Sequence, residues 1–238
     1  MEKREKLYEG KAKIIYATDE PDKVVIYFKD DTTAFDGVKK EEIVGKGVIN
    51  NAISSLIFEV LNKRGIPTHY IKKLSDREML AKRVEIIPVE VVVRNFAAGS
   101  FTRRYGIPEG TKLEKPLVET FWKNDELHDP LVCAEHIELL KLADLKDIEE
   151  MKKIALEVNE VLKAFFAARE ILLVDFKLEF GKTPDGQLVL ADEISPDSCR
   201  LWDAKTKKKL DKDVFRFDLG DLKEVYNELL NRLKGEGQ

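Results

Sequence analysis

The chain has 238 residues, of which 43% are apolar and 36% charged, so it can bury a core in one large domain or two smaller ones. Its 41 basic and 45 acidic residues give a net charge of −4, which argues against nucleic acid as a partner. No apolar run reaches the ~18 residues of a membrane span, the charged N-terminus lacks a signal-peptide core, and two distant cysteines, Cys133 and Cys199, favour the reducing cytoplasm.

The first third of the sequence is rich in predicted strands. Alternating apolar residues predict strands at Lys13–Tyr16 and Val24–Lys29. The spacing of apolar residues in Asn51–Arg64 predicts a helix that ends before Gly65. A further strand is predicted at Ile86–Arg94, and the segment 97–115, rich in Gly, Pro and charge, is predicted to be an exposed functional loop.

A long amphipathic helix is predicted at Leu145–Arg169, with Asp144 as its N-cap. Two strands and a terminal helix follow, at Ile171–Phe180, Gln187–Ile194 and Leu219–Leu233. Strands and helices do not alternate as regular βαβ units, so the pattern predicts an α+β fold. We expect two domains, residues 1–86 and 87–238, with a boundary near Val84–Pro88.

The run LVDFKLEFG, from Leu173 to Gly181, carries the strongest chemical pattern. Residues two apart on a strand share a face. Three charged side chains therefore point one way, namely those of Asp175, Lys177 and Glu179, while the intervening Phe and Leu side chains are predicted to enter the core.

A turn at Asp185-Gly186 would pair this strand with the next one. If these two residues form the whole turn, counting outward places Glu179 opposite Asp192. Two facing carboxylates repel each other unless a cation lies between them, and carboxylates with water and phosphate oxygens are how Mg²⁺ is usually held. The pattern therefore predicts a metal site, although a charged, solvated strand face would have the same sequence.

Several cationic segments could bind anions. Gly10 lies beside Lys11 and Lys13, which share a strand face, although no Walker A motif is present. Arg94 precedes a small-residue loop that ends at Gly99-Ser100, a pairing suited to carboxylate or phosphate. Two more arginines, Arg200 and Arg216, follow the predicted hairpin.

Taken together, six segments resemble the phosphoribosylaminoimidazole-succinocarboxamide synthase (SAICAR synthetase) family. They are LYEGKAKIIY, DDTTAFDG, IIPVEVVVRNFAAGS, KNDELHDP, LVDFKLEFG and DEISPDSCRLWD, in that order along nearly the whole chain. The resemblance implies a two-domain α+β fold. Its N-terminal β-rich lobe would resemble the small lobe of protein kinases, with ATP in the cleft beside a larger mixed α/β domain.

The family joins carboxyaminoimidazole ribonucleotide (CAIR) to L-aspartate while splitting ATP, so the resemblance implies these three substrates and Mg²⁺. It implies that ATP is bound by Lys11, Lys13, Lys82, Val84 and Lys123, the metal by Glu179 and Asp192, and the ribonucleotide by Arg94, Ser100 and Arg200. Asp36 and Arg216 are further candidate substrate-binding residues. Lys177 would contact the transferring phosphoryl group. Asp175 would be either a base for the aspartate amine or an orienter of Lys177.

Two alternative functions share parts of this pattern. A small-molecule or protein kinase would share the ATP lobe and the acid pair, but the chain has neither H-R-D nor D-F-G. A non-catalytic nucleotide-binding module would have no use for a second, arginine-rich anion site. The sequence leaves open whether the chain forms a homo-oligomer.

Overall fold

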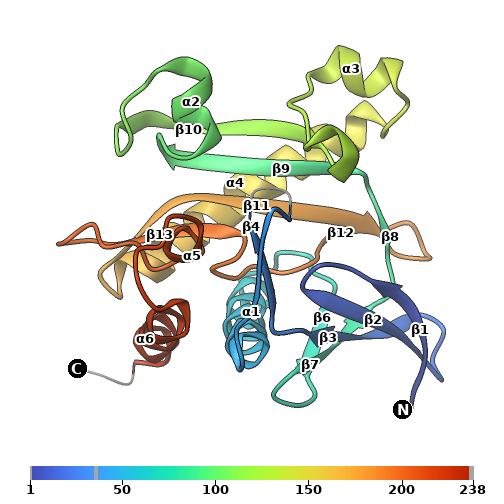
Figure 1. Ribbon diagram of the computed structural model, residues 1–238. Helices are drawn as coiled ribbons and strands as arrows, with labels where there is room; N and C mark the ends of the chain where they lie inside the picture. The colour runs from blue at the N-terminus through green and yellow to red at the C-terminus, as the bar shows by residue number, and fades with distance from the viewer. Residues whose placement is uncertain (1, 35–36, 236–238) are drawn as a thin grey trace.

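The computed structural model describes residues 2–34 and 37–235, so the predicted site residue Asp36 lies outside the described residues. Figure 1 shows a five-stranded sheet near the N-terminus and a six-stranded sheet beyond it, with helices around both. The fold is mixed α+β, as the sequence predicts. One buried apolar cluster extends through both sheets and the helices and includes Ile26, Phe180 and Leu229.

The five-stranded sheet has the order β1-β2-β3-β7-β6, and every neighbouring pair is antiparallel. Its strands are β1 (Lys3–Glu9), β2 (Lys13–Thr18), β3 (Lys23–Phe28), β6 (Tyr70–Lys73) and β7 (Glu78–Lys82). A separate hairpin joins β4 (Asp31–Ala34) to β5 (Lys39–Glu42).

The six-stranded sheet is built around β11 (Ile171–Lys182), which pairs antiparallel with four other strands. Those strands are β8 (Glu85–Ile86), β9 (Val89–Phe96), β12 (Leu188–Ala191) and β13 (Cys199–Asp203), and β10 (Lys112–Trp122) pairs with β9 at the edge. The predicted strand at 86–94 is thus two strands. Because β11 touches so many neighbours, its side chains meet residues from distant parts of the chain.

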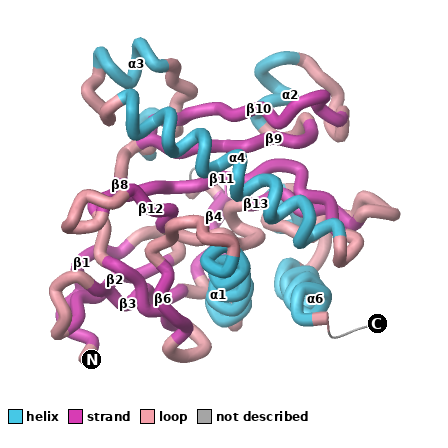
Figure 2. The backbone as a smooth tube through the Cα atoms, turned by 180° about the vertical axis from the view of Figure 1, so that it is seen from behind, coloured by secondary structure: helices cyan, strands magenta, loops and turns pink. Residues whose placement is uncertain are grey.

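Helix α4 crosses the face formed by β9 and β11, as Figure 2 shows from behind. The helices are α1 (Lys46–Lys63), α2 (Ser100–Tyr105), α3 (Ala134–Leu139), α4 (Leu145–Ala167), α5 (Asp213–Arg216) and α6 (Leu222–Lys234), with a 3₁₀ turn η1 (Asp125–Leu127). Asp144 caps α4 by accepting a hydrogen bond from the Lys146 N–H, as predicted. Within residues 2–34 and 37–235, none of the helices has the length and hydrophobicity needed to cross a bilayer.

Two predictions of local structure were wrong. Helix α1 begins at Lys46, five residues earlier than predicted, because Asp30 accepts hydrogen bonds from the N–H groups of Gly45 and Gly47 at 3.1 and 2.9 Å. A residue far away in sequence thus satisfies the first helical turn. The predicted loop at 97–115 contains α2 and the start of β10, because the Ser100–Tyr105 turn packs Phe101 into the protein.

Replacing Asp30 by Asn is expected to lower the free energy of unfolding by about 2 kcal/mol above pH 4. Burial alone would raise the pKa of Asp30, but its bidentate pairing with Arg77, at 2.8 Å for both contacts, and the two backbone N–H groups lower it to about 2. A lowered carboxyl pKa stabilises the fold above the unfolded-state value and loses this effect as the pH falls through about 2. Chemical denaturation of both proteins between pH 2 and 7 should show the difference shrinking with acidity.

A buried ion pair connects α1 to the segment after β12. Lys46 Nζ lies 2.7 Å from Asp197 Oδ2, and their side chains are 1% and 7% exposed. The hydroxyl of Tyr226 on α6 donates to the other oxygen of Asp197 at 2.6 Å. Burial alone would raise the pKa of Asp197, but Lys46 and Lys212 hold it well below its usual range. The Asp197 carboxylate therefore joins α1 and α6 to the segment after β12.

Candidate active site

Strand β11 separates a chemical face from a core face, as its sequence predicts. Phe176, Leu178 and Phe180 are almost completely buried. The alternate residues make polar contacts: Asp175 with two arginines, and Lys177 with Glu179 at 2.7 Å. The one strand therefore brings three charged side chains to the boundary between two cavities, which are described below.

The predicted two-residue turn was wrong. Thr183 and Gln187 close a three-residue loop through the Thr183 N–H and the Gln187 carbonyl, with Gly186 at φ 85°. Glu179 consequently pairs with Ala191 rather than Asp192. Asp192 still reaches the cavity that Glu179 lines, since it lies just beyond β12 with φ 59°, where strand alternation no longer sets the side-chain direction.

A cavity of about 460 Å³, the lysine cavity, lies between the two sheets. Its wall is largely apolar on the N-terminal side and charged on the β11 side. It is lined by Leu7, Tyr8, Lys13, Ile15, Val24, Ile26, His69, Lys82, Arg83, Val84, Ile86, Lys123, Glu179 and Asp192. Of the five residues predicted to bind ATP, four are in this lining. The fifth, Lys11, instead pairs with Asp125 of η1 at 2.8 Å.

Lysines neutralise the acids of the lysine cavity. Lys13 contacts Asp192 and lies 3.1 Å from Glu193, while Lys123 and Lys177 both contact Glu179. Burial alone would raise the pKa of Asp192, but the nearby ammonium groups hold it well below its usual range. Burial, which by itself would lower the pKa of Lys177, is likewise outweighed by its acidic neighbours, so that pKa is raised. Asp192 and Lys177 are therefore both charged near neutral pH.

The acid pair fits the chemistry of a hard cation. Glu179 and Asp192 are buried or partly buried, ionised, and open into the same cavity. Among the described residues, no group of three or more His, Cys, Asp or Glu could hold a metal ion. A Mg²⁺ ion at this pair would therefore need its other oxygen ligands from water or from a bound phosphate, as is usual for that ion.

His69 is a cavity residue that the sequence analysis missed. It is 2% exposed, and its Nε2 atom has no hydrogen-bond partner among the described residues. Burial lowers its pKa to about 4, so the ring is neutral. Its backbone joins the two sheets, since the His69 N–H donates to Leu190 O and the His69 carbonyl accepts from the Lys82 N–H. No local pattern marks such a residue, because its neighbours come from distant strands.

The predicted anion-binding arginines belong to a second cluster, which meets β11 at Asp175, nearer the start of the strand than Glu179. Four arginines alternate with three carboxylates in one connected series, which we call the arginine–carboxylate chain. Its order is Arg104, Glu119, Arg94, Asp175, Arg200, Asp213 and Arg216. Since this series has one more arginine than carboxylates, the arginine–carboxylate chain favours a bound anion. Glu119, Asp213 and Arg104 were missed by the sequence analysis.

Asp175 lies in the middle of this chain. Its Oδ2 atom is 2.6 Å from Arg94 and 3.1 Å from Arg200. The partners of Lys177, by contrast, are Glu90 and Glu179. Within the described part of the chain, Asp175 therefore orients arginines, and no contact supports the predicted orientation of Lys177.

Ser100 and Arg94 line a second cavity of about 510 Å³, the arginine cavity, with Arg103, Arg104 and Glu90. Ser100 is at the first turn of α2, where its hydroxyl accepts from Arg94 Nη2 at 3.3 Å and Arg104 Nη1 at 3.0 Å. The two predicted residues are thus brought together, whereas Arg200 and Arg216 lie further along the arginine–carboxylate chain.

Replacing Gly99 by Ala is expected to lower the free energy of unfolding by about 1–3 kcal/mol. Gly99 has φ 58° and ψ −128°, and an added Cβ would lie 2.5 Å from Arg200 Nη2. The strained backbone and the displaced guanidinium group both oppose the change. Thermal denaturation would measure the loss. Gly186→Ala is a suitable comparison, because its φ is also positive but nothing lies within 4 Å of the added Cβ; an equal loss in both variants would exclude the Arg200 clash.

Comparison with known proteins identifies the family. The SAICAR synthetase family profile matches residues 6–233. The phosphoribosylaminoimidazole-succinocarboxamide synthase of Persephonella marina is 63% identical, with the alignment covering all of both chains. That of Aquifex aeolicus is 68% identical over 87% of this chain and 95% of its own. A SAICAR synthetase solved in complex with ADP is 51% identical, covers 98% of this chain and 99% of its own, and superposes with a TM-score of 0.94.

These matches extend over nearly the whole chain and agree with the six sequence segments and the mixed α+β fold. The chain belongs to the SAICAR synthetase family.

Proposed function

We propose that the chain joins the carboxylate of carboxyaminoimidazole ribonucleotide to the amine of L-aspartate, splitting ATP to ADP and phosphate, in purine biosynthesis. Its close relatives carry the name of this ligase, and one SAICAR synthetase was solved with ADP. The observation that carries the proposal is the position of β11. This strand places Lys177 and Glu179 by the lysine cavity and Asp175 within the arginine–carboxylate chain.

The proposed reaction proceeds through an acyl phosphate. A carboxylate oxygen of the ribonucleotide attacks the γ-phosphorus of ATP, and the bond from that phosphorus to the leaving ADP oxygen breaks. The aspartate amine then attacks the acyl carbon, phosphate leaves, and the nitrogen loses a proton. Such a sequence asks the protein mainly to align the groups and to offset negative charge.

The lysine cavity is the proposed ATP site. Lys11, Lys13 and Lys123 would contact phosphates after leaving their present acidic partners. Lys82 and Val84, at the end of β7 and just beyond it, would line the adenine. Lys177 would contact the transferring phosphoryl group. Mg²⁺, held by Glu179 and Asp192, would offset the charge of the phosphates.

The arginine-rich side is the proposed ribonucleotide site. Arg94, Ser100, Arg200 and Arg216 would bind the phosphate and carboxylate of CAIR, and Asp36 remains a proposed member of the site. Asp175 would orient Arg94 and Arg200, as its contacts support. A role for Asp175 as base would require it to give up one of these arginines.

We further propose that residues 1–86 form an ATP lobe like the small lobe of protein kinases and that residues 87–238 form the second domain. In support, all strands of the five-stranded sheet lie within residues 3–82, and every strand of the six-stranded sheet except the two-residue β8 lies beyond residue 88. The long helix α1 accompanies the first sheet. The lysine cavity between the sheets would then be the cleft that holds ATP.

Release of ADP from ATP and CAIR, with and without L-aspartate, tests the proposed function. We expect sustained ADP release and SAICAR formation only when aspartate is present. Turnover that ignores aspartate and leaves a phosphorylated product would identify a kinase instead. Binding of ATP without turnover in any combination of substrates would identify a nucleotide-binding module.

A further inference from the structure

Glu119 is a buried carboxylate that joins two arginines of different elements. It lies on β10 and is 7% exposed. Its Oε2 atom accepts from Arg94 Nε of β9 at 2.6 Å, and its Oε1 atom accepts from Arg104 Nη2 of α2 at 2.5 Å. Hydrogen bonds between ionised groups are roughly twice as strong as neutral ones. Glu119 thus fixes the relative positions of two cations.

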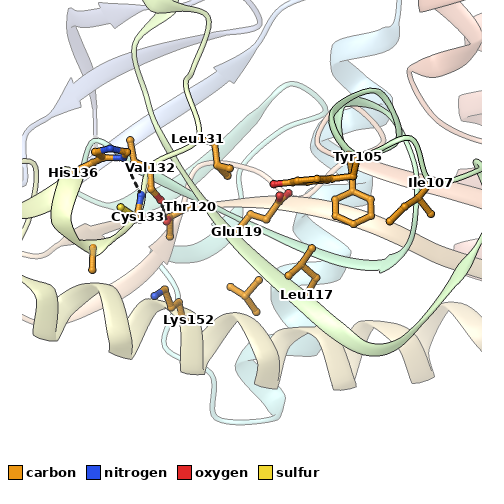
Figure 3. A pocket seen from close by; sticks show the side chains of 13 residues that line it. Tyr105, Ile107, Leu117, Glu119, Thr120, Leu131, Val132, Cys133, His136 and Lys152 are labelled. Carbon is orange, nitrogen blue, oxygen red and sulfur yellow. Dashed lines mark hydrogen bonds between the residues drawn. The ribbon is translucent and has the colours of Figure 1, made fainter.

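The two arginines converge on one hydroxyl group. Ser100 Oγ is 3.3 Å from Arg94 Nη2 and 3.0 Å from Arg104 Nη1. Two guanidinium groups this close repel each other, and the repulsion is large where water is excluded. The carboxylate of Glu119, between them, offsets it. Glu119 also lines a separate cavity of about 720 Å³, in which its side chain extends toward Tyr105 (Figure 3).

The two arginines differ in the donors they can still offer. Arg94 is 3% exposed and uses its N–H groups on Glu119, Asp175, Ser100 and the Ala98 carbonyl. Arginine has five N–H donors in all, so little of Arg94 remains for a ligand. Arg104 is 28% exposed and uses N–H groups only on Ser100 and Glu119 among the described residues. Of these two arginines, Arg104 therefore has more donors left to offer to the arginine cavity.

We propose that Arg104 is a further anion-binding residue of the ribonucleotide site, and that Glu119 is a positioning residue that holds Arg104 and Arg94 around Ser100. This inference rests on the proposed function and refines it. Arg94 shapes the site from within the protein and has one N–H donor left for the ribonucleotide, while Arg104 contacts the anionic group of the ribonucleotide. The rings of Tyr105 and Phe121, both 5.4 Å from the Arg104 guanidinium carbon, restrict its movement.

The test replaces Arg104 by Met and by Lys, and Glu119 by Gln. Equilibrium binding of CAIR alone is measured by calorimetry, and KM values for CAIR, ATP and aspartate are measured by ADP release. Charge-assisted hydrogen bonds contribute about 1.5–3 kcal/mol, so Arg104→Met should weaken CAIR binding about 10- to 100-fold. The KM for ATP should not change. Arg104→Lys, which keeps the charge without the planar fork, should recover part of the affinity.

Glu119→Gln keeps the side-chain volume and removes the charge. It should weaken CAIR binding by a similar factor, and adding it to Arg104→Met should cost less than the two losses combined, because both act on one contact. Lys115→Met on the exposed part of β10 removes the same charge as Arg104→Met and should leave CAIR binding unchanged. Thermal denaturation of every variant checks that it is folded.

Unchanged CAIR affinity in a folded Arg104→Met protein would overturn the assignment of Arg104. If the losses of CAIR affinity from Arg104→Met and Glu119→Gln add strictly in the double variant, Glu119 has no positioning role. A Glu119→Gln variant that loses kcat alone, with unchanged CAIR binding, would also overturn that role. Failure of the proposed function is distinguishable, because the wild-type protein would then release no aspartate-dependent ADP, whereas the calorimetric comparison needs no turnover.

Discussion

Asp192→Asn should slow aspartate-dependent ADP release by about 10²- to 10³-fold while leaving the protein folded. Asn is one of the few residues that tolerate the φ of 59° found at this position. The change removes one negative charge from the proposed metal pair and weakens the contact to Lys13. Lys13 keeps Glu193 at 3.1 Å, so the buried ammonium group is not left alone. Steady-state kinetics, with thermal denaturation as a check on folding, would measure both effects.

The matched control is Asp185→Asn. Asp185 belongs to the same hairpin but is exposed at its turn and does not line the cavity, and the substitution changes the net charge equally. It should retain wild-type turnover. Near wild-type turnover in folded Asp192→Asn would sink the assignment of Asp192 to the metal site.

Lys46→Met is expected to lower the free energy of unfolding by about 3 kcal/mol. The substitution keeps most of the side-chain volume but leaves Asp197 buried without its closest cation. Lys212, with Nζ 4.0 Å from Asp197, offsets only part of the loss. Urea denaturation at neutral pH would measure it, because Asp197 is ionised there.

A double substitution distinguishes a stranded charge from simple loss of packing. Asp197→Asn combined with Lys46→Met should cost less than the sum of the single changes, because no uncompensated carboxylate remains. Lys63→Met, in the exposed last turn of the same helix, should change stability by under about 0.5 kcal/mol. Additive losses in the double variant would contradict the stranded-charge explanation.

Patterns within one element were predictable from the sequence. The placing of Asp175, Lys177 and Glu179 in polar contacts and of Phe176, Leu178 and Phe180 in the core needs only the two-residue period of a strand, and the structure confirms it. The long helix α4 and its cap at Asp144 depend equally on local periodicity and capping chemistry. The family resemblance likewise depended on six short local segments that occur in the family's order.

Contacts that join distant elements were not predictable in the same way. The predicted register of Glu179 was wrong by one residue, because the Thr183 side chain and the Gln187 backbone close a longer turn. Nothing near Glu119 in sequence indicates that arginines from β9 and α2 will meet it. The early start of α1 likewise depends on Asp30, from outside the helix. In each case the deciding partner comes from outside the local pattern.

The contact between Lys13 and Asp192 joins residues 179 positions apart. During synthesis, Lys13 leaves the ribosome long before its partner has been translated. A contact so distant in sequence requires closing a very long loop, which slows folding. Until β11 and β12 arrive, the apolar residues Ile15, Val24 and Ile26 have no opposite wall. For part of translation, the apolar side of the lysine cavity is therefore an exposed, aggregation-prone surface that a chaperone can recognise.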